Sequence, residues 1–271
     1  MSRKRRAVFF LALAVIALGV GYVVYSIAGR ANRNAVYDEI QETAVSPTPA
    51  PTPVPTPVES PALDETPAPT EEVQEPVYVS PIDFETLWEI NEDIYAWIEI
   101  PDTVVRYPIV QSPSNDNYYL DHTIEGKAGY PGSIFTCRVN AKDFTDFNTV
   151  VYGHNMKDNS MFGSLSDYRD LDFLQTHTEI KVYTPEKELT YRVFAAVIYD
   201  DRLITSAFDN SDPAACRRFL DTIYGNRNMN SHVLQDVEVT EADRILTLST
   251  CIGGRPNNRY LVLAVLTDEI S

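Results

Sequence analysis

Cysteine and histidine are scarce in this chain. Its 271 residues include three cysteines and four histidines, and no two of them stand at a ligand spacing such as C-x-x-C or H-x-x-x-H. The sequence therefore predicts no metal site and no other cofactor. Three cysteines cannot all pair within a monomer, so at least one thiol is free. We expect no disulfide between Cys137, in a strand-like stretch, and Cys216, in a helix-like stretch.

Basic residues are also few. There are 22 Lys and Arg against 39 Asp and Glu, a formal net charge of −17. Residues 1–29 carry four basic residues and residues 30–80 carry two basic and nine acidic ones, which leaves −14 for residues 81–271. An acidic domain of this size argues against a nucleic-acid partner bound through the general field.

One apolar stretch is long enough to matter for location. It runs without a charge from Ala7 to Gly29 and can span a bilayer as a helix. A cleaved signal peptide is the alternative, but this stretch exceeds the roughly 7 to 15 residues of a signal core. The basic cluster at 1–6 precedes it, so we expect a single-pass anchor over 7–29 with a cytoplasmic N-terminus and the rest outside the cell.

Proline is concentrated in one region. Eleven of the 18 prolines lie between Pro47 and Pro81. We interpret residues 30–80 as an acidic, proline-rich stalk, which at about 3.1 Å per residue would reach on the order of 100 Å from the membrane. Residues 81–271 suffice for one domain with one sizeable core.

Apolar periodicity predicts a mostly β domain with a few helices. Short helices are expected over 81–91 and 162–174, and a longer one over 212–224, where Pro213 occupies the first turn. The predicted strands, the fifth and sixth of which read as a hairpin, are 98–100, 104–110, 132–137, 149–152, 179–184, 189–199, 245–250 and 260–266.

Cys251 is the candidate nucleophile. An isolated cysteine usually behaves as a small buried hydrophobe. This one follows the strand-like run Ile245-Leu-Thr-Leu-Ser-Thr250 and precedes the polar, glycine-containing segment 252–258. Catalytic groups tend to sit at such strand ends beside loops.

His154 and Arg259 are the candidate partners. His154 ends the apolar run Val150-Val-Tyr152 and precedes a polar turn, although a structural histidine is the alternative. Arg259 opens the apolar run 260–266, where a charge is ordinarily a solvated strand end. Arginine cannot be neutralised at working pH, so beside a thiol it favours the thiolate and can polarise a carbonyl. We favour Arg259 over Arg255, which lies inside the loop.

These residues carry a resemblance to the sortases, and in detail to class B sortases. The matching segments occur in the family's order across residues 81 to 271. They are Trp97-Ile-Glu-Ile-Pro101, Tyr107-Pro-Ile-Val-Gln111, Tyr118-Tyr-Leu120, Gly132-Ser-Ile-Phe135, Tyr152-Gly-His-Asn-Met-Lys-Asp158, Ser160-Met-Phe-Gly163, Leu248-Ser-Thr-Cys251 and Arg259-Tyr-Leu-Val262.

The resemblance implies a fold and a chemistry. The fold would be a closed, mostly antiparallel β-barrel of about eight strands with added N-terminal and inserted helices. Cys251 would attack a threonine carbonyl in the sorting signal of a secreted protein and form a thioester. An amine from a cell-wall precursor, or a pilin lysine, would then release the product. His154 would move protons, and Arg259 would hold the substrate backbone and the oxyanion.

Several assignments around these residues stay open. Asn155, Ser249 and Thr250 flank the catalytic candidates and are candidate substrate-binding residues, with strand packing as the alternative for the Ser and Thr. Cys137 stands where the resemblance leads us to expect an acidic residue, and we expect it to pack near the site. A plain cysteine hydrolase and a stalked, non-catalytic surface binding module remain as alternative functions.

Overall fold

The computed structural model describes residues 16, 18–21, 35–45 and 78–271. The predicted stalk over 46–77 and most of the predicted anchor over 7–29 lie outside these residues. In the part that the model describes, no helix is long and apolar enough to cross a bilayer.

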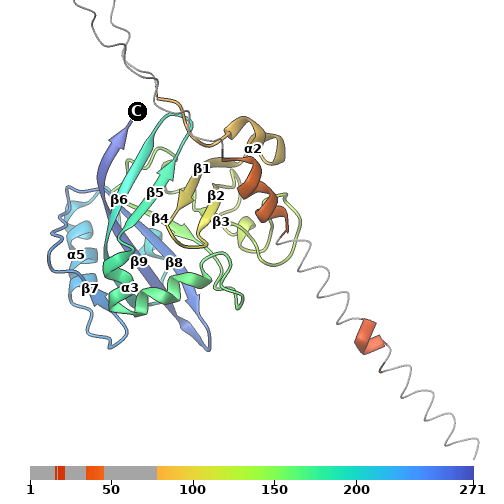
Figure 1. Cartoon of the computed structure of the whole chain (residues 1–271). Coiled ribbons are helices and arrows are strands. Elements are labelled where there is room, and N and C mark those ends of the chain that lie inside the picture. The colour runs from red at the N-terminus through yellow and green to blue at the C-terminus, as the bar shows by residue number, and fades with distance from the viewer. Residues whose placement is uncertain (1–15, 17, 22–34, 46–77) are drawn as a thin grey trace, which may run out of the picture.

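A nine-stranded mixed sheet forms the body of the domain (Figure 1). The strand order is β5-β1-β2-β3-β4-β8-β9-β6-β7, and a further pairing of β5 with β6 closes eight of the strands into a barrel. The strands are β1 (Ile94–Glu99), β2 (Arg106–Val110), β3 (Ile134–Thr136), β4 (Asn148–Tyr152), β5 (Glu179–Tyr183), β6 (Glu188–Asp200), β7 (His232–Val233), β8 (Ile245–Ile252) and β9 (Arg255–Ile270).

The prediction of a mostly antiparallel, closed barrel of about eight strands is confirmed. Two neighbouring pairs, β2 with β3 and β4 with β8, are parallel, and the other pairs are antiparallel. Each parallel pair is joined by a long connection, as parallel strands require. Barrel closure removes most exposed sheet edges.

Helices cover two sides of the barrel. Figure 1 shows α2 (Phe84–Ile90) beside β1 and β2, and α5 (Pro213–Tyr224) with β7 on the opposite side. Asp83 caps α2 by accepting from Thr86 N at 3.0 Å, and Asp212 caps α5 by accepting from Ala214 N at 3.0 Å. The remaining short helices are η1 (Tyr118–Leu120), η2 (Gly163–Arg169), α3 (Leu171–Thr176) and α4 (Ile204–Ala207).

The expected single helix over 162–174 is wrong in its continuity. Residues 163–169 form a 3-10 helix, and α3 starts afresh at Leu171. Asp170 separates the two because its carboxylate accepts from Asp172 N at 2.8 Å, which is an N-cap arrangement. The sequence contains this capping aspartate, but its apolar residues alone do not reveal the break.

Residues 35–45 pack on the barrel, although the sequence analysis placed them in the stalk. Residues 35–43 are helical, and Tyr37, Ile40 and Ala44 belong to the buried core. Val45 forms an antiparallel bridge with Ile82, and Asp83 N donates to Ala44 O at 2.8 Å. This short segment therefore belongs to the folded domain, beside α2 (Figure 1).

Candidate active site

Strand pairing places the three catalytic candidates at one end of the barrel. In the parallel pair β4–β8, Tyr152 lies opposite Ser249, so His154 and Cys251 each follow two residues beyond matched positions. Gly153 N continues this ladder by donating to Ser249 O at 3.1 Å. Because side chains two apart on a strand share a face, His154 and Cys251 emerge on the same side of neighbouring strands.

Cys251 and Arg259 are direct partners across the β8–β9 hairpin. Side chains of directly opposed residues in an antiparallel pair lie on the same face of the sheet with their Cβ atoms about 5 Å apart. The thiol and the guanidinium are therefore neighbours. The turn between the strands is the pair Gly253-Gly254, with Gly254 at φ +75°. The polar segment 255–258, expected as loop, is thus part of β9.

These residues open onto one cavity of about 360 Å³. His154, Cys251 and Arg259 all line it, and Cys251 is exposed while Arg259 is half-buried. Arg255, the rival cation, is absent from the lining. The other lining residues are Asn117, Leu120, Phe135, Cys137, Tyr152, Gly153, Asp201, Arg202, Leu203, Ile204, Ser249 and Thr250.

The hydrogen bonds of His154 fix which ring nitrogen is free for chemistry. Nε2 lies 2.6 Å from Leu120 O, and a carbonyl oxygen only accepts, so Nε2 carries a proton. The neutral ring then has its lone pair on Nδ1. Proton transfer at His154 therefore takes place at Nδ1.

Arg259 is oriented by backbone carbonyls of its own hairpin. Nη1 donates to Pro256 O at 2.9 Å and to Asn258 O at 3.1 Å. The planar fork has five N–H donors, so these bonds leave others for a substrate. The guanidinium is consequently held at the cavity as a fixed cation.

Asn155 and Thr250 connect the histidine strand to the cysteine strand. Asn155 Nδ2 donates to Cys251 O at 2.8 Å, and Thr250 Oγ1 donates to Gly153 O at 2.7 Å. Both side chains therefore have partners within the protein. Ser249 and Thr250 are buried and line the cavity, whereas Asn155 is outside the lining. In the structure, Asn155 and Thr250 fix the relative position of Cys251 and His154.

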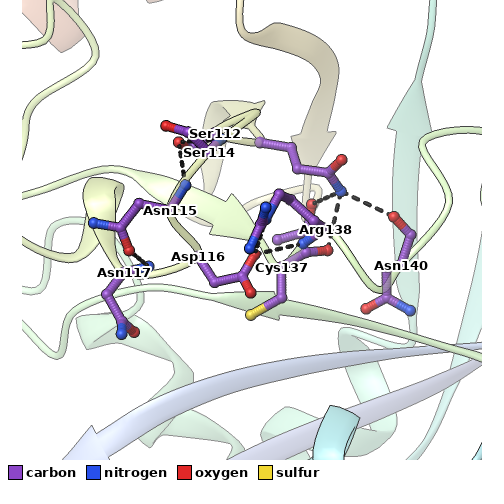
Figure 2. A network of polar contacts seen from close by, with 10 residues as sticks. Ser112, Ser114, Asn115, Asp116, Asn117, Cys137, Arg138 and Asn140 are labelled. Atoms are coloured by element: carbon purple, nitrogen blue, oxygen red, sulfur yellow. Dashed lines mark hydrogen bonds and ion pairs between the residues drawn. The ribbon is translucent and has the colours of Figure 1, made fainter.

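Cys137 lies in the same cavity, as the sequence analysis expected, but differs from Cys251. It is a free, buried thiol. Burial raises its pKa to about 11, with the Asp116 carboxylate adding in the same direction. The neighbouring Arg138 pairs with Asp116 at 3.1 Å (Figure 2). Since a thiolate is the reactive form, Cys137 stays protonated and unreactive at neutral pH. Cys216 is likewise a free, buried thiol, in α5.

The sequence analysis missed the wall formed by residues 201–204. The long strand β6 pairs with β9 so that Tyr199 lies opposite Arg259. The chain that leaves β6 at Asp200 must therefore pass close to the cavity, and it places Leu203 and Ile204 there. The signal available in the sequence was the length of the apolar run 189–199, which carries its end as far as Arg259.

Comparison with known proteins decides the family. A sortase domain model matches residues 98–267, which is more than half of the chain. The chain belongs to the sortase family. The described relatives are class B sortases, and members of this family are cysteine transpeptidases.

Three relatives set the scale of this similarity to class B sortases. Sortase B of Listeria monocytogenes is 38% identical over 166 residues, which are 61% of this chain and 65% of that protein. Sortase B of Staphylococcus aureus is 36% identical over 170 residues, 62% of this chain and 67% of that protein. The match to these curated relatives thus spans about two thirds of their length. The solved S. aureus sortase B–substrate complex superposes with a TM-score of 0.59 at 31% identity, covering 68% of this chain and 84% of that one.

Proposed function

We propose that this sortase is a transpeptidase that cleaves a sorting signal after threonine and carries the acyl group on Cys251. The observation that carries the proposal is the shared cavity, which brings an exposed thiol, an imidazole and a fixed guanidinium together. The solved relative in complex with a substrate supports a peptide as the ligand of this cavity.

The proposed acylation uses each group once. The Cys251 thiolate attacks the threonine carbonyl carbon, and Arg259 stabilises the negative charge that develops on the oxygen. The tetrahedral intermediate collapses, the carbon–nitrogen bond of the signal breaks, and the leaving amine takes a proton from Nδ1 of the His154 imidazolium. A thioester on Cys251 and a neutral His154 remain.

Deacylation runs in the opposite sense. An amine attacks the thioester, His154 Nδ1 accepts its proton, and the Cys251 thiolate leaves. A new amide bond forms, and the enzyme regains its starting protonation. We propose an amine of a cell-wall precursor as the acceptor. Because thiolate and imidazolium are both required at the start, the rate should follow a bell-shaped dependence on pH.

Mass spectrometry of the full-length protein in detergent micelles tests this proposal. A panel of threonine-containing pentapeptides is offered, and peptide mapping looks for an acyl group on Cys251. We expect the adduct in the wild type and in a Cys216→Ala control, and none in Cys251→Ala. An adduct that survives in Cys251→Ala, or an unmodified wild type with every peptide, would contradict the proposal. Free acid released in the presence of excess amine would indicate a hydrolase instead.

We also propose that residues 7–29 anchor the enzyme in the membrane, with residues 1–6 inside the cell and the catalytic domain outside. If so, the domain begins much nearer the bilayer than a stalk of 30–80 implies. The helical residues start at 35, five residues after the proposed anchor, a span on the order of 20 Å. Cell fractionation, followed by protease treatment of intact cells, tests both the anchoring and the orientation.

A further inference from the structure

His154 is supported from one side by a single stretch of chain, residues 119–133, which we call the support segment. Leu120 O accepts the bond from Nε2 at 2.6 Å. The Tyr130 ring packs on the imidazole with 4.7 Å between centroids. Gly132, at φ +70°, approaches so closely that a Cβ there would lie 3.1 Å from Cδ2 of His154 and 2.7 Å from Leu120 O. The position of the imidazole therefore depends on this segment.

The support segment has little regular structure of its own. Its internal bonds include Ser133 N to Tyr119 O at 3.0 Å and Gly129 N to Asp121 O at 2.6 Å. One side is fixed by Asn91, whose amide donates to Ile124 O and to the Tyr119 hydroxyl, both at 2.8 Å. A short irregular segment of this kind needs further partners to hold its shape.

The further partner comes from the N-terminal helical residues. The Tyr37 hydroxyl donates to Gly132 O at 2.6 Å and accepts from Ile124 N at 3.3 Å, so one oxygen ties the two arms of the segment together. It also lies 3.3 Å from Ser133 Oγ. Gly132 is the same residue whose backbone contacts the His154 ring. Only one residue therefore separates Tyr37 from His154.

Tyr37 itself is held in place by the domain. Its side chain is 5% exposed, and its ring meets the Tyr107 ring edge-on at 5.8 Å between centroids. Nearby, Gln41 Nε2 donates to Arg106 O on β2 at 2.7 Å. Burial raises the pKa of Tyr37 to about 12, so the hydroxyl remains a donor throughout the neutral range. The hydroxyl is thus a permanent buried tie.

We propose that Tyr37 is a positioning residue for His154, and that residues 35–45 contribute to the active site although they do not line its cavity. The inference rests on the proposed function in that it treats His154 as the proton carrier. Without the Tyr37 hydroxyl, Gly132 O and Ile124 N lose a buried partner. The support segment then loosens, and Leu120 O no longer holds Nε2–H in place, so the Nδ1 proton chemistry is weakened.

The test compares Tyr37→Phe with Tyr168→Phe in the full-length protein. Tyr168 is an equally buried tyrosine whose hydroxyl donates to His177 O at 2.8 Å, away from the cavity lining. Each variant loses one buried hydroxyl and keeps its ring, so the losses of thermal stability should be similar. We expect Tyr37→Phe to lower kcat for peptide acylation by about tenfold with little change in KM, and Tyr168→Phe to leave kcat unchanged.

A second readout is independent of turnover. In protein labelled with 15N-histidine, the His154 ring signals report which nitrogen is protonated. We expect Tyr37→Phe, and not Tyr168→Phe, to shift them toward a mixture of tautomers. Unchanged signals and kcat in Tyr37→Phe, with only the stability lowered, would overturn the positioning role. If the wild type forms no acyl adduct, the proposed function fails, while the ring signals still decide the role of Tyr37.

Discussion

Arg259 combines two roles in one side chain. Its Nη1 donates to two carbonyls of the β8–β9 hairpin while the guanidinium lines the cavity. Lysine has one nitrogen in place of this planar fork, so it cannot serve the hairpin carbonyls and a substrate oxygen in the same geometry.

We therefore predict that Arg259→Lys lowers kcat/KM for acylation on the order of 100-fold, the usual cost of losing one oxyanion donor. Thermal unfolding should change little, because the side chain is only half-buried. Arg255→Lys, on the exposed part of the same hairpin, is the matched control and should retain activity. Equal activity of Arg259→Lys and wild type would show that charge alone suffices.

Cys137 makes stability depend on alkaline pH. Its pKa rises from an ordinary 9.0 to about 11 in the folded protein. The folded state therefore keeps a proton that the unfolded chain releases, so the contribution is complete below about pH 9 and is lost as the pH rises toward 11. At pH 10.5 the loss from this thiol should be about 2 kcal/mol.

Urea unfolding at pH 8 and pH 10.5 measures this loss. A Cys137→Ala variant should show a smaller decrease between the two values, because the buried tyrosines and Cys216 titrate in both proteins and cancel in the comparison. If both proteins lose the same free energy of unfolding, the thiol is not the source. The same property explains why an alkylating reagent at neutral pH should modify Cys251 in preference to Cys137.

At the scale of elements, the sequence was most informative about strands. All eight expected strands exist, because alternating or continuous apolar runs have few other uses in a domain of this size. The hairpin that opposes Cys251 and Arg259 also followed from a short connection between two apolar runs. The resemblance supplied the barrel, since strand order depends on long-range pairings that local patterns do not encode.

What the sequence concealed lies where side chains meet across long separations. The parallel pairing of β4 with β8, which aligns His154 with Cys251, joins residues nearly a hundred apart. The same holds for Tyr37 and Gly132, 95 positions apart, because no periodicity in a helix of about nine residues identifies its partner. Asn155 and Thr250 were expected near the substrate, and the structure gives both of them backbone partners in the protein.

At the scale of the whole molecule, the bridge between Val45 and Ile82 changes the meaning of the proline-rich region. The 36 residues between these two leave the domain and return to the same edge of it. Whatever path they follow, their length does not separate the domain from the N-terminal residues that precede 35. The region is an insertion in the domain and cannot act as the spacer that its composition predicts.

Replacing residues 46–77 by eight Gly and Ser residues tests this directly. The connection shortens from 36 to 12 residues, and for a flexible loop the reduced closure entropy should stabilise the fold by about 1 kcal/mol. Thermal and urea unfolding measure this gain. Acylation of a soluble peptide should be unchanged, because Tyr37 keeps its bond to Gly132 and the cavity is untouched. The matched control removes residues 35–45 as well, and it should lose both stability and activity. A shortened chain that unfolds more easily than the wild type would mean that residues 46–77 contribute contacts of their own to the folded domain.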